Sequence, residues 1–343
     1  MTPDQEFAPR LLDWHRQHGR HDLPWQQTRD AYRIWLSEIM LQQTQVATVI
    51  PYYQRFLARF PDIPALAAAA QDEVMALWSG LGYYARARNL HRCAQVLVAQ
   101  HGGRFPEDAA IIAELPGIGR STAAAIAAFA FGRHGAILDG NVKRVLTRVF
   151  GIEGFPGKPA VERELWALAE SLLPPRDIEA YTQGIMDLGA TLCTRARPDC
   201  LTCPMRGVCV AERDGRQAAL PTARPARALP ARESRVTIFT DGRKVLLEQR
   251  PPTGIWGSLW ALPEGTPEGL AARFGLRILD RSELPSLKHT FTHFRLTLHP
   301  VRCVVRSAAG AMEGSLAWVS LDALATTALP TPIRTLLAQL SES

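Results

Sequence analysis

The sequence predicts a multidomain protein with an all-α region followed by a smaller α+β domain, on three observations. From Pro9 to about Ala211, apolar residues recur three and four positions apart, as amphipathic helices require. A proline-rich stretch with few large apolar side chains follows at 213–234 and predicts an extended linker. Beyond it, residues 236–240 and 244–249 flank Asp241-Gly242, which indicates a β-hairpin.

The C-terminal third carries both kinds of element. Residues 291–305 are rich in valine, leucine and phenylalanine and alternate in part, so they predict a second stretch of sheet. Residues 332–340 can close the chain as a helix. We therefore expect a helical region over 1–212, a linker over 213–234 and an α+β domain over 235–343, sizes that suit separate domains.

The charge balance favours a polyanionic partner. The chain has 39 lysines and arginines against 33 aspartates and glutamates, a net charge of +6, although this excess alone is a weak indication of nucleic-acid binding. Residues 1–20 contain three acidic side chains and lack the apolar core of a signal peptide. No run approaches the ~20 apolar residues of a membrane span. We expect a soluble, cytoplasmic protein without membrane contact.

A glycine-punctuated turn lies between two helical segments at Leu115–Thr122. Gly117 and Gly119 permit a tight hairpin whose backbone N–H groups point outward, at the positive end of the next helix. Such a turn can hold a phosphate without reading sequence, which makes Leu115, Gly117, Gly119 and Ser121 candidate DNA contacts. An ordinary helix–turn–helix connection has the same local pattern.

Four of the six cysteines lie close together, at Cys193, Cys200, Cys203 and Cys209. In a reducing compartment this spacing indicates a metal site rather than disulfides. Four thiolates can hold a [4Fe–4S] cluster, and they equally suit a tetrahedral zinc ion. Spacing alone does not distinguish the two.

An early helical segment carries a candidate acid, Glu38. On a 3.6-residue period Glu38 shares a face with Ile34, Trp35, Leu41 and Gln42, so we expect it to be screened from water. Burial raises the pKa of a carboxyl group toward the range of a general acid. A salt-bridged or half-exposed glutamate remains the alternative from periodicity alone.

Together these motifs resemble the helix–hairpin–helix DNA glycosylases, in which an aspartate follows the hairpin after a glycine- and proline-rich loop. Asp139 stands in that place, twenty residues after Gly119, where a simple helix-capping aspartate is the alternative. The cysteine spacing resembles that of the iron–sulfur members of this superfamily, and the Glu38 segment resembles the motif of its MutY family of adenine DNA glycosylases. The resemblance implies a six-helix lobe at about 31–137, an iron–sulfur lobe of 1–30 plus 138–212 holding a [4Fe–4S] cluster, and a Nudix/MutT-like C-terminal domain.

The resemblance also implies a reaction on double-stranded DNA. Glu38 would protonate a flipped adenine at N7, Asp139 would stabilise the positive charge on the deoxyribose, and Asn141 would assist. The adenine would be mispaired with 8-oxoguanine or guanine. Ser121 stands where relatives that also cleave the backbone have a nucleophilic lysine, and a hydroxyl cannot form an imine. We therefore expect a monofunctional glycosylase. We also expect it to be a monomer and to associate with the nucleoid.

The resemblance also implies roles for further residues, including those of the adenine pocket. Contacts to the DNA are implied for Gln42, Gln43, Tyr83 and Arg86, and Lys143 is placed near the phosphate backbone. The adenine pocket is bordered by Trp25 and Gln183. The loop with Phe291, Thr292 and His293 would contact 8-oxoguanine. Core packing is the alternative for Tyr83, and filling of a strand face is the alternative for Phe291 and His293.

Three other functions stay open on sequence. An endonuclease III-like pyrimidine glycosylase and lyase would need the lysine that Ser121 replaces. A catalytically silent damage sensor would bind without releasing a base. A nucleotide hydrolase built on the C-terminal domain would need a run of metal-binding glutamates, and residues 257–275 contain only Glu264 and Glu268.

Overall fold

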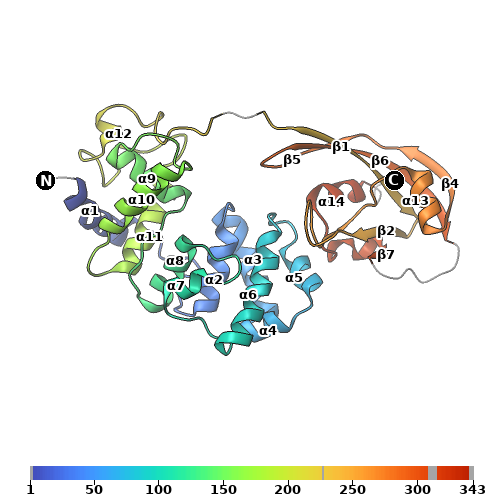
Figure 1. Ribbon diagram of the computed structural model, residues 1–343, viewed down its shortest axis with the longest axis horizontal. Helices are drawn as coiled ribbons and strands as arrows, with labels where there is room; N and C mark the ends of the chain where they lie inside the picture. The colour runs from blue at the N-terminus through green and yellow to red at the C-terminus, as the bar shows by residue number, and fades with distance from the viewer. Residues whose placement is uncertain (1–2, 226–227, 308–314, 340–343) are drawn as a thin grey trace. The chain divides into compact units, whose positions relative to one another are not determined.

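The computed structural model describes residues 3–225, 228–307 and 315–339 (Figure 1). Residues 1–2, 226–227, 308–314 and 340–343 lie outside the description, among them two residues of the predicted linker and the last residue of the predicted C-terminal helix. Two compact units result, one of Met1–Ala67 with Arg92–Ala226 and one of Ala68–His91 with Arg227–Ser343. The predicted lobe and domain boundaries stay predictions.

The first unit is helical. Its helices are α1 (Pro3–His18), α2 (Ala31–Leu41), α3 (Val46–Arg59), α4 (Ile63–Ala68), α7 (Ala109–Ala113), α8 (Arg120–Phe131), α9 (Gly140–Phe150), α10 (Pro159–Ser171), α11 (Ile178–Asp187), the π-helix η1 (Leu188–Leu192) and α12 (Val210–Arg213). Helix α6 (Ala85–His101) begins in the second unit and ends in the first. None of the helices in the described residues is long and apolar enough to cross a membrane.

The core of this unit holds α9 in place. Val142, Val145 and Leu146 on α9 are fully buried, together with Leu11 of α1 and Leu188 of η1. The helix ends at Gly151, whose left-handed backbone (φ 70°) closes the last turn. Burial on several sides keeps both ends of α9 in a defined position, and the residues that matter for function lie at those ends.

The second unit is built on one mixed sheet. Its strands are β1 (Ala231–Thr240), β2 (Lys244–Gln249), β3 (Trp260–Ala261), β4 (Leu276–Glu283), β5 (Leu287–Thr290), β6 (Arg295–Ser307) and β7 (Leu316–Ser320). The main order is β3-β2-β1-β6-β4, with β5 paired to β6 and β7 paired to β2. The helices are α5 (Gln71–Trp78), α13 (Pro267–Phe274), the 3-10 helix η2 (Leu321–Ala325) and α14 (Thr331–Ala338).

The predicted hairpin is confirmed, since β1 and β2 pair antiparallel with Thr240 opposite Val245. The Asp241 carboxylate accepts hydrogen bonds from the N–H groups of Arg243 and Lys244 at 2.8 and 2.7 Å and so holds the turn. Strand β1 starts at Ala231, earlier than predicted, because residues 231–240 pair in parallel with β6. That long-range pairing has no local signal in the sequence.

Within the second unit, the segment 68–91 contacts the C-terminal domain. The hydroxyl of Ser79 donates to the carbonyl of Leu329 at 3.1 Å, and Arg334 Nη2 donates to the same hydroxyl at 3.0 Å. Arg88 Nη1 donates to the carbonyl of Gly257 at 2.6 Å. A segment predicted to lie in a helical lobe is therefore joined by polar contacts to the sheet domain.

Candidate active site and nucleic-acid contacts

Helix α2 presents Glu38. The helix begins at Asp30, whose carboxylate accepts from the N–H of Tyr32 at 2.8 Å, and it buries Ile34 and Trp35. Glu38 itself is partly buried. Desolvation raises its pKa from the ordinary 4.5 to about 8, and the nearby charge of Asp139 adds to the shift. The screening from water that the sequence predicts is therefore partial.

Asp139 is the N-cap of α9. Its Oδ1 accepts hydrogen bonds from the N–H groups of Asn141 and Val142, both at 2.8 Å. Burial raises the pKa of this carboxyl as well, but the two hydrogen bonds and the charges of Arg144 and Lys143 oppose the rise. Asp139 is thus a helix cap, as the alternative interpretation held, and at the same time a partly buried group.

The two carboxyl groups differ in what stabilises their charge. Asp139 has backbone donors and nearby cations, whereas burial and the neighbouring carboxylate both act against a charged Glu38. When the two share one proton, it therefore resides on Glu38. Glu38 is therefore the member of the pair that retains its proton to higher pH.

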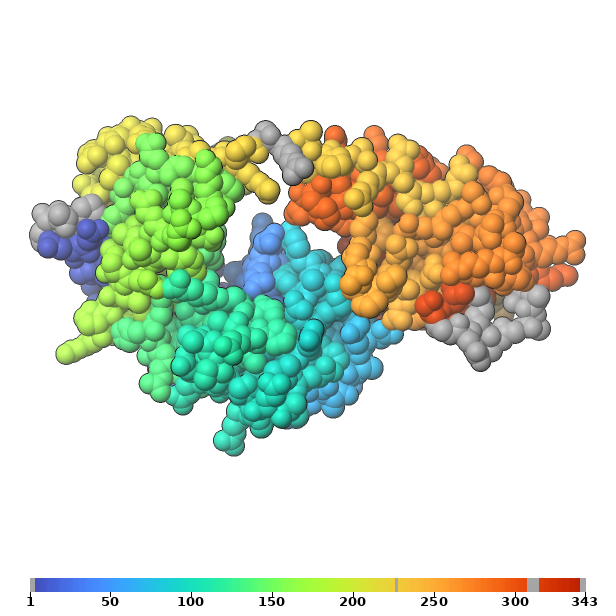
Figure 2. All heavy atoms as spheres, in the orientation of Figure 1, coloured from blue at the N-terminus to red at the C-terminus, as the bar shows by residue number. Residues whose placement is uncertain are grey.

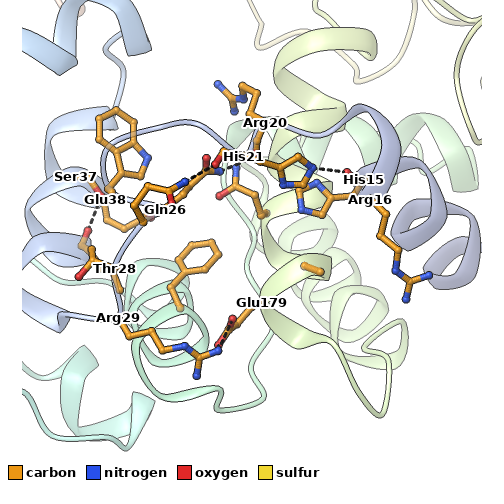
Figure 3. Close-up of a pocket in the computed structure, with 16 residues that line it drawn as sticks. His15, Arg16, Arg20, His21, Gln26, Thr28, Arg29, Ser37, Glu38 and Glu179 are labelled. Carbon is orange, nitrogen blue, oxygen red and sulfur yellow. Dashed lines mark hydrogen bonds and ion pairs between the residues drawn. The ribbon is translucent and has the colours of Figure 1, made fainter.

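Glu38 opens into a cavity of about 620 Å³, within the ~300–1,000 Å³ usual for small-molecule sites. Trp25 and Gln183, both predicted for the adenine pocket, also line it. Figure 3 shows Glu38 on one side and His21 with Arg20 across the cavity. Trp25 is 7% exposed and packs edge-on against Tyr53, with ring centroids 5.4 Å apart.

The hairpin between α7 and α8 has the predicted geometry at Gly117, whose φ of 78° requires glycine. Gly119 caps α8 with an ordinary backbone and open space around it. Leu115 is 5% exposed, so only its backbone can reach DNA. The hydroxyl of Ser121 accepts from the N–H of Leu138 at 2.9 Å, which ties the hairpin to the residue before Asp139.

Two predicted contacts lie on strained, exposed backbone. Gln43 (φ 58°) and Tyr83 (φ 50°) both occupy the left-handed region, and Tyr83 is 46% exposed. The exposure excludes core packing for Tyr83. Gln42, next to Gln43, reaches toward the Thr122 hydroxyl at 3.5 Å, a distance at the limit of a hydrogen bond.

Two of the predicted DNA contacts, Arg86 and Lys143, are engaged within the protein. Arg86 donates inward to the carbonyls of Leu81 and Gly82 at 3.3 Å, and its burial lowers the pKa to about 10. The Lys143 ammonium lies 2.6 Å from a carboxylate oxygen of Glu162. Arg86 shapes the loop that carries Tyr83. Lys143 would have to leave Glu162 to contact a phosphate.

Asn141 belongs to a network that the sequence did not reveal. Its side-chain oxygen accepts from Arg144 Nη2 at 2.8 Å, and Arg144 Nε donates to the carbonyl of Cys193 at 2.7 Å. A Cβ on Gly189 would lie 2.7 Å from the Cβ of Asn141, so only glycine allows this close approach. One arginine thereby connects Asn141 with the first cysteine of the loop.

The four cysteines line one cavity at the far end of α9. Arg148 is 3% exposed there and donates toward the sulfur of Cys193 at 3.5 Å, while Cys209 Sγ donates to the Arg148 carbonyl at 3.4 Å. Within the described chain, no three histidine, cysteine or acidic side chains form a group that could hold a metal ion. Figure 2 shows in yellow the segment after Cys193, at the edge of the helical unit.

The predicted lesion loop is a turn between β5 and β6, so the predicted sheet begins four residues later than expected. The N–H of Phe291 donates to the carbonyl of Phe294 at 2.8 Å, and their rings stack with centroids 4.4 Å apart. Thr292 and His293 are exposed at the tip. His293 therefore does not fill a strand face.

Acidic side chains of the sheet domain are engaged in ion pairs. Glu264 pairs with Arg250 at 3.2 Å, and Glu268 pairs with Arg281 at 2.7 Å. Both of the glutamates that residues 257–275 contain are therefore paired with arginines.

Comparison with known proteins assigns both parts of the chain. Residues 36–171 match the HhH-GPD superfamily of base excision DNA repair proteins, and residues 235–339 match the NUDIX domain. A thermostable thymine-DNA glycosylase of known structure superposes with a TM-score of 0.57 at 31% sequence identity, over 62% of this chain and 97% of that one.

Two relatives align over most of their length. The adenine DNA glycosylase of Buchnera aphidicola subsp. Acyrthosiphon pisum (strain APS) is 37% identical, over 86% of this chain and 85% of that protein. That of Buchnera aphidicola subsp. Baizongia pistaciae (strain Bp) is 34% identical, over 98% and 97%. Since the similarity extends through both the helical and the Nudix-like parts, the chain belongs to the adenine DNA glycosylase family of base excision repair enzymes.

Proposed function

We propose that this enzyme hydrolyses the N-glycosidic bond of adenine mispaired with 8-oxoguanine or guanine, acting as a monomer on double-stranded DNA. The observation that carries the proposal is Glu38: a carboxyl with a pKa of about 8, beside Asp139, in a cavity large enough for a purine. A base inside a duplex reaches such a cavity only after it is flipped out of the stack.

The two carboxyl groups take opposite roles. Protonated Glu38 gives its proton to N7 of adenine, so that the base leaves as a neutral molecule when the bond from C1′ to N9 breaks. Ionised Asp139 stabilises the positive charge that develops on the sugar. Water adds to C1′ and returns a proton to Glu38. Asn141 is placed beside Asp139 by the N-cap and by Arg144.

Ser121 supports hydrolysis over lyase chemistry. Its hydroxyl is engaged with the Leu138 N–H, and it cannot form the Schiff base that a lysine forms with the opened sugar. The pyrimidine glycosylase and lyase alternative lacks its nucleophile at this position. The hairpin backbone at Gly117 and Gly119 remains available to hold a phosphate.

Gln43 and Tyr83 are proposed to contact the bases around the extruded adenine. Exposed side chains on left-handed backbone are costly to maintain, and such strain is commonly retained at functional sites. Gln42 lies next to Gln43 and would support the same contact. Filling the gap left by a flipped base requires such projecting side chains.

A [4Fe–4S] cluster is proposed at Cys193, Cys200, Cys203 and Cys209. Family membership is consistent with an iron–sulfur cluster, and the four cysteines line one cavity. Such a cluster contributes structural stability or redox sensitivity. The buried guanidinium of Arg148 beside Cys193 would stabilise thiolate charge.

The exposed turn at Thr292 and His293 is proposed to read 8-oxoguanine. Both side chains project from a turn that is held by the stacked rings of Phe291 and Phe294. A hydroxyl can donate to and accept from the oxidised edge of the base. Phe291 supplies the rigid base of this turn.

The proposed acid and anion are tested by excision of adenine opposite 8-oxoguanine. Glu38→Gln and Asp139→Asn should each slow single-turnover release by ~10²–10⁴-fold, because each removes a group needed at the transition state. DNA affinity should change far less. Glu107→Gln, in an exposed ion pair with Arg133, is the matched control. Strand breakage should appear only after alkali, and unslowed release by Glu38→Gln contradicts the proposal.

The pH dependence follows from the two carboxyl groups. Protonated Glu38 predominates below its pKa of about 8, so the rate of base release should fall about tenfold per unit above that pH. Because burial also raises the pKa of Asp139, the loss of rate at acidic pH should begin above the usual pKa range of an aspartate. Single-turnover rates across the pH range measure both limbs. A rate that still rises above pH ~9 contradicts the assignment of Glu38.

Thermal unfolding gives an independent check of the same pKa. A folded-state pKa raised from 4.5 to about 8 means that wild-type stability falls as pH rises through that window. Glu38→Gln carries no charge to bury. Its melting temperature should therefore exceed that of the wild type by a margin that grows from acidic pH to pH 8.

The cofactor is tested by metal content. The purified protein should hold about four irons per chain, little zinc and a broad visible absorbance. Cys200→Ser should lower both iron content and absorbance, because it removes one ligand. Cys93→Ala, at a buried cysteine outside the loop, should leave them unchanged. One zinc per chain would contradict the cluster.

Lesion reading is tested by two substrates. Thr292→Ala and His293→Ala should lower the preference for adenine opposite 8-oxoguanine over adenine opposite guanine by about tenfold, as loss of a specific base contact would. Thr326→Ala, elsewhere in the same unit, is the control. An unchanged ratio of the two rates in both variants would remove this turn from lesion recognition.

A further inference from the structure

A buried carboxylate lies behind one wall of the active-site cavity, at the end of α11. The Asp187 side chain has no exposed surface. Arg20 donates to it from Nε at 2.8 Å, from Nη2 at 2.6 Å and from its backbone N–H at 2.8 Å. Gln183, one helical turn earlier, donates from Nε2 to Oδ1 at 2.8 Å. Asp187 is thus a buried acceptor with fixed donors.

The charge of Asp187 is balanced by Arg20. The other basic side chain nearby is His15, whose Nδ1 lies 3.7 Å from Oδ2. Burial lowers the pKa of His15, and the ring of His21 packs against it with centroids 4.8 Å apart. The guanidinium of Arg20 is therefore the cation at hydrogen-bond distance from Oδ1, and the Arg20 backbone N–H occupies Oδ2.

An ionised carboxylate can only accept hydrogen bonds, and this decides the orientation of the Gln183 amide. The NH₂ group of Gln183 must face Asp187, because the amide oxygen would meet another acceptor there. Gln183 also lines the cavity that holds Glu38. Its amide oxygen is therefore the polar atom left for a bound base, and the cavity wall presents an acceptor.

The orientation matters for a purine with N7 at Glu38, an arrangement that rests on the proposed function. The 6-substituent lies on the same edge of the purine as N7. In adenine that substituent is an amino group, which donates to an acceptor. In hypoxanthine it is an oxygen, which would oppose the Gln183 oxygen and leave both acceptors unpaired.

We propose that Asp187 is a positioning residue for base specificity: it holds the Gln183 amide with its oxygen toward the cavity, so that the site selects a 6-aminopurine over a 6-oxopurine. Arg20 fixes Asp187 in turn. Asp187 touches no base itself. Its contribution is to prevent rotation of the amide by a half-turn.

The test compares release of adenine and of hypoxanthine, each opposite 8-oxoguanine, under single-turnover conditions. In Asp187→Asn the new side chain offers both a donor and an acceptor, so that the Gln183 amide can take either orientation. The ratio of adenine to hypoxanthine release should fall by about tenfold, the value of one hydrogen bond gained or opposed. Asp177→Asn, in an exposed ion pair with Arg16 at the start of the same helix, should leave the ratio unchanged.

A second variant isolates the amide. Gln183→Glu has oxygens at both positions, so rotation cannot change what it presents to the base. Asp187→Asn added to Gln183→Glu should therefore leave the ratio of that background unaltered. If Asp187→Asn does not fold, two substitutions of Gln183 test the acceptor that faces the base. Gln183→Glu keeps an oxygen there and should keep the ratio of adenine to hypoxanthine release, whereas Gln183→Met removes that oxygen and should lower the ratio.

Parallel loss of both rates in Asp187→Asn would show a structural role and overturn the proposal. A change of ratio that persists in the Gln183→Glu background would also overturn it, because it could not act through the amide. Failure of the wild type to release adenine would instead count against the proposed function, since the ratio would then have no reference.

Discussion

Burial of Glu38 beside Asp139 is the constraint on which the site depends. Ionising two neighbouring carboxyl groups in one desolvated site costs much free energy, so one of them, Glu38, keeps a proton near neutral pH. The fold decides which one by giving Asp139 the N–H groups that begin α9. The fold thereby brings the carboxyl group that retains its proton and the N-cap carboxyl group of α9 into one site.

Helix α9 connects this pair with the cysteine loop. Asp139 caps its N-terminus, Arg144 joins Asn141 to the carbonyl of Cys193, and Arg148 reaches the sulfur of the same cysteine. The core side chains between these polar residues fix the helix. These hydrogen bonds connect the cysteine loop with the end of α9 that carries the proposed catalytic Asp139.

In the second unit, polar contacts join the Tyr83 segment to the sheet domain. Arg334 bridges Ser79 and the turn after η2, and Arg88 binds the carbonyl of Gly257. Gly257 follows Trp256, whose ring lies 6.0 Å from that of Phe291 in the proposed lesion turn. Tyr83, proposed to contact the bases around the extruded adenine, and the proposed lesion turn are thus parts of one compact unit.

By itself, the sequence determined the helical and α+β parts, the β1–β2 hairpin and the partial screening of Glu38, because periodicity and turn chemistry are local. Only the tertiary structure decided that Leu115 is buried, that Arg86 and Lys143 are engaged within the protein, and that Asp187 orients Gln183. These depend on partners distant in the chain or on which face of a helix meets the core. Hydrogen bonds across such separations leave no pattern in the order of residues.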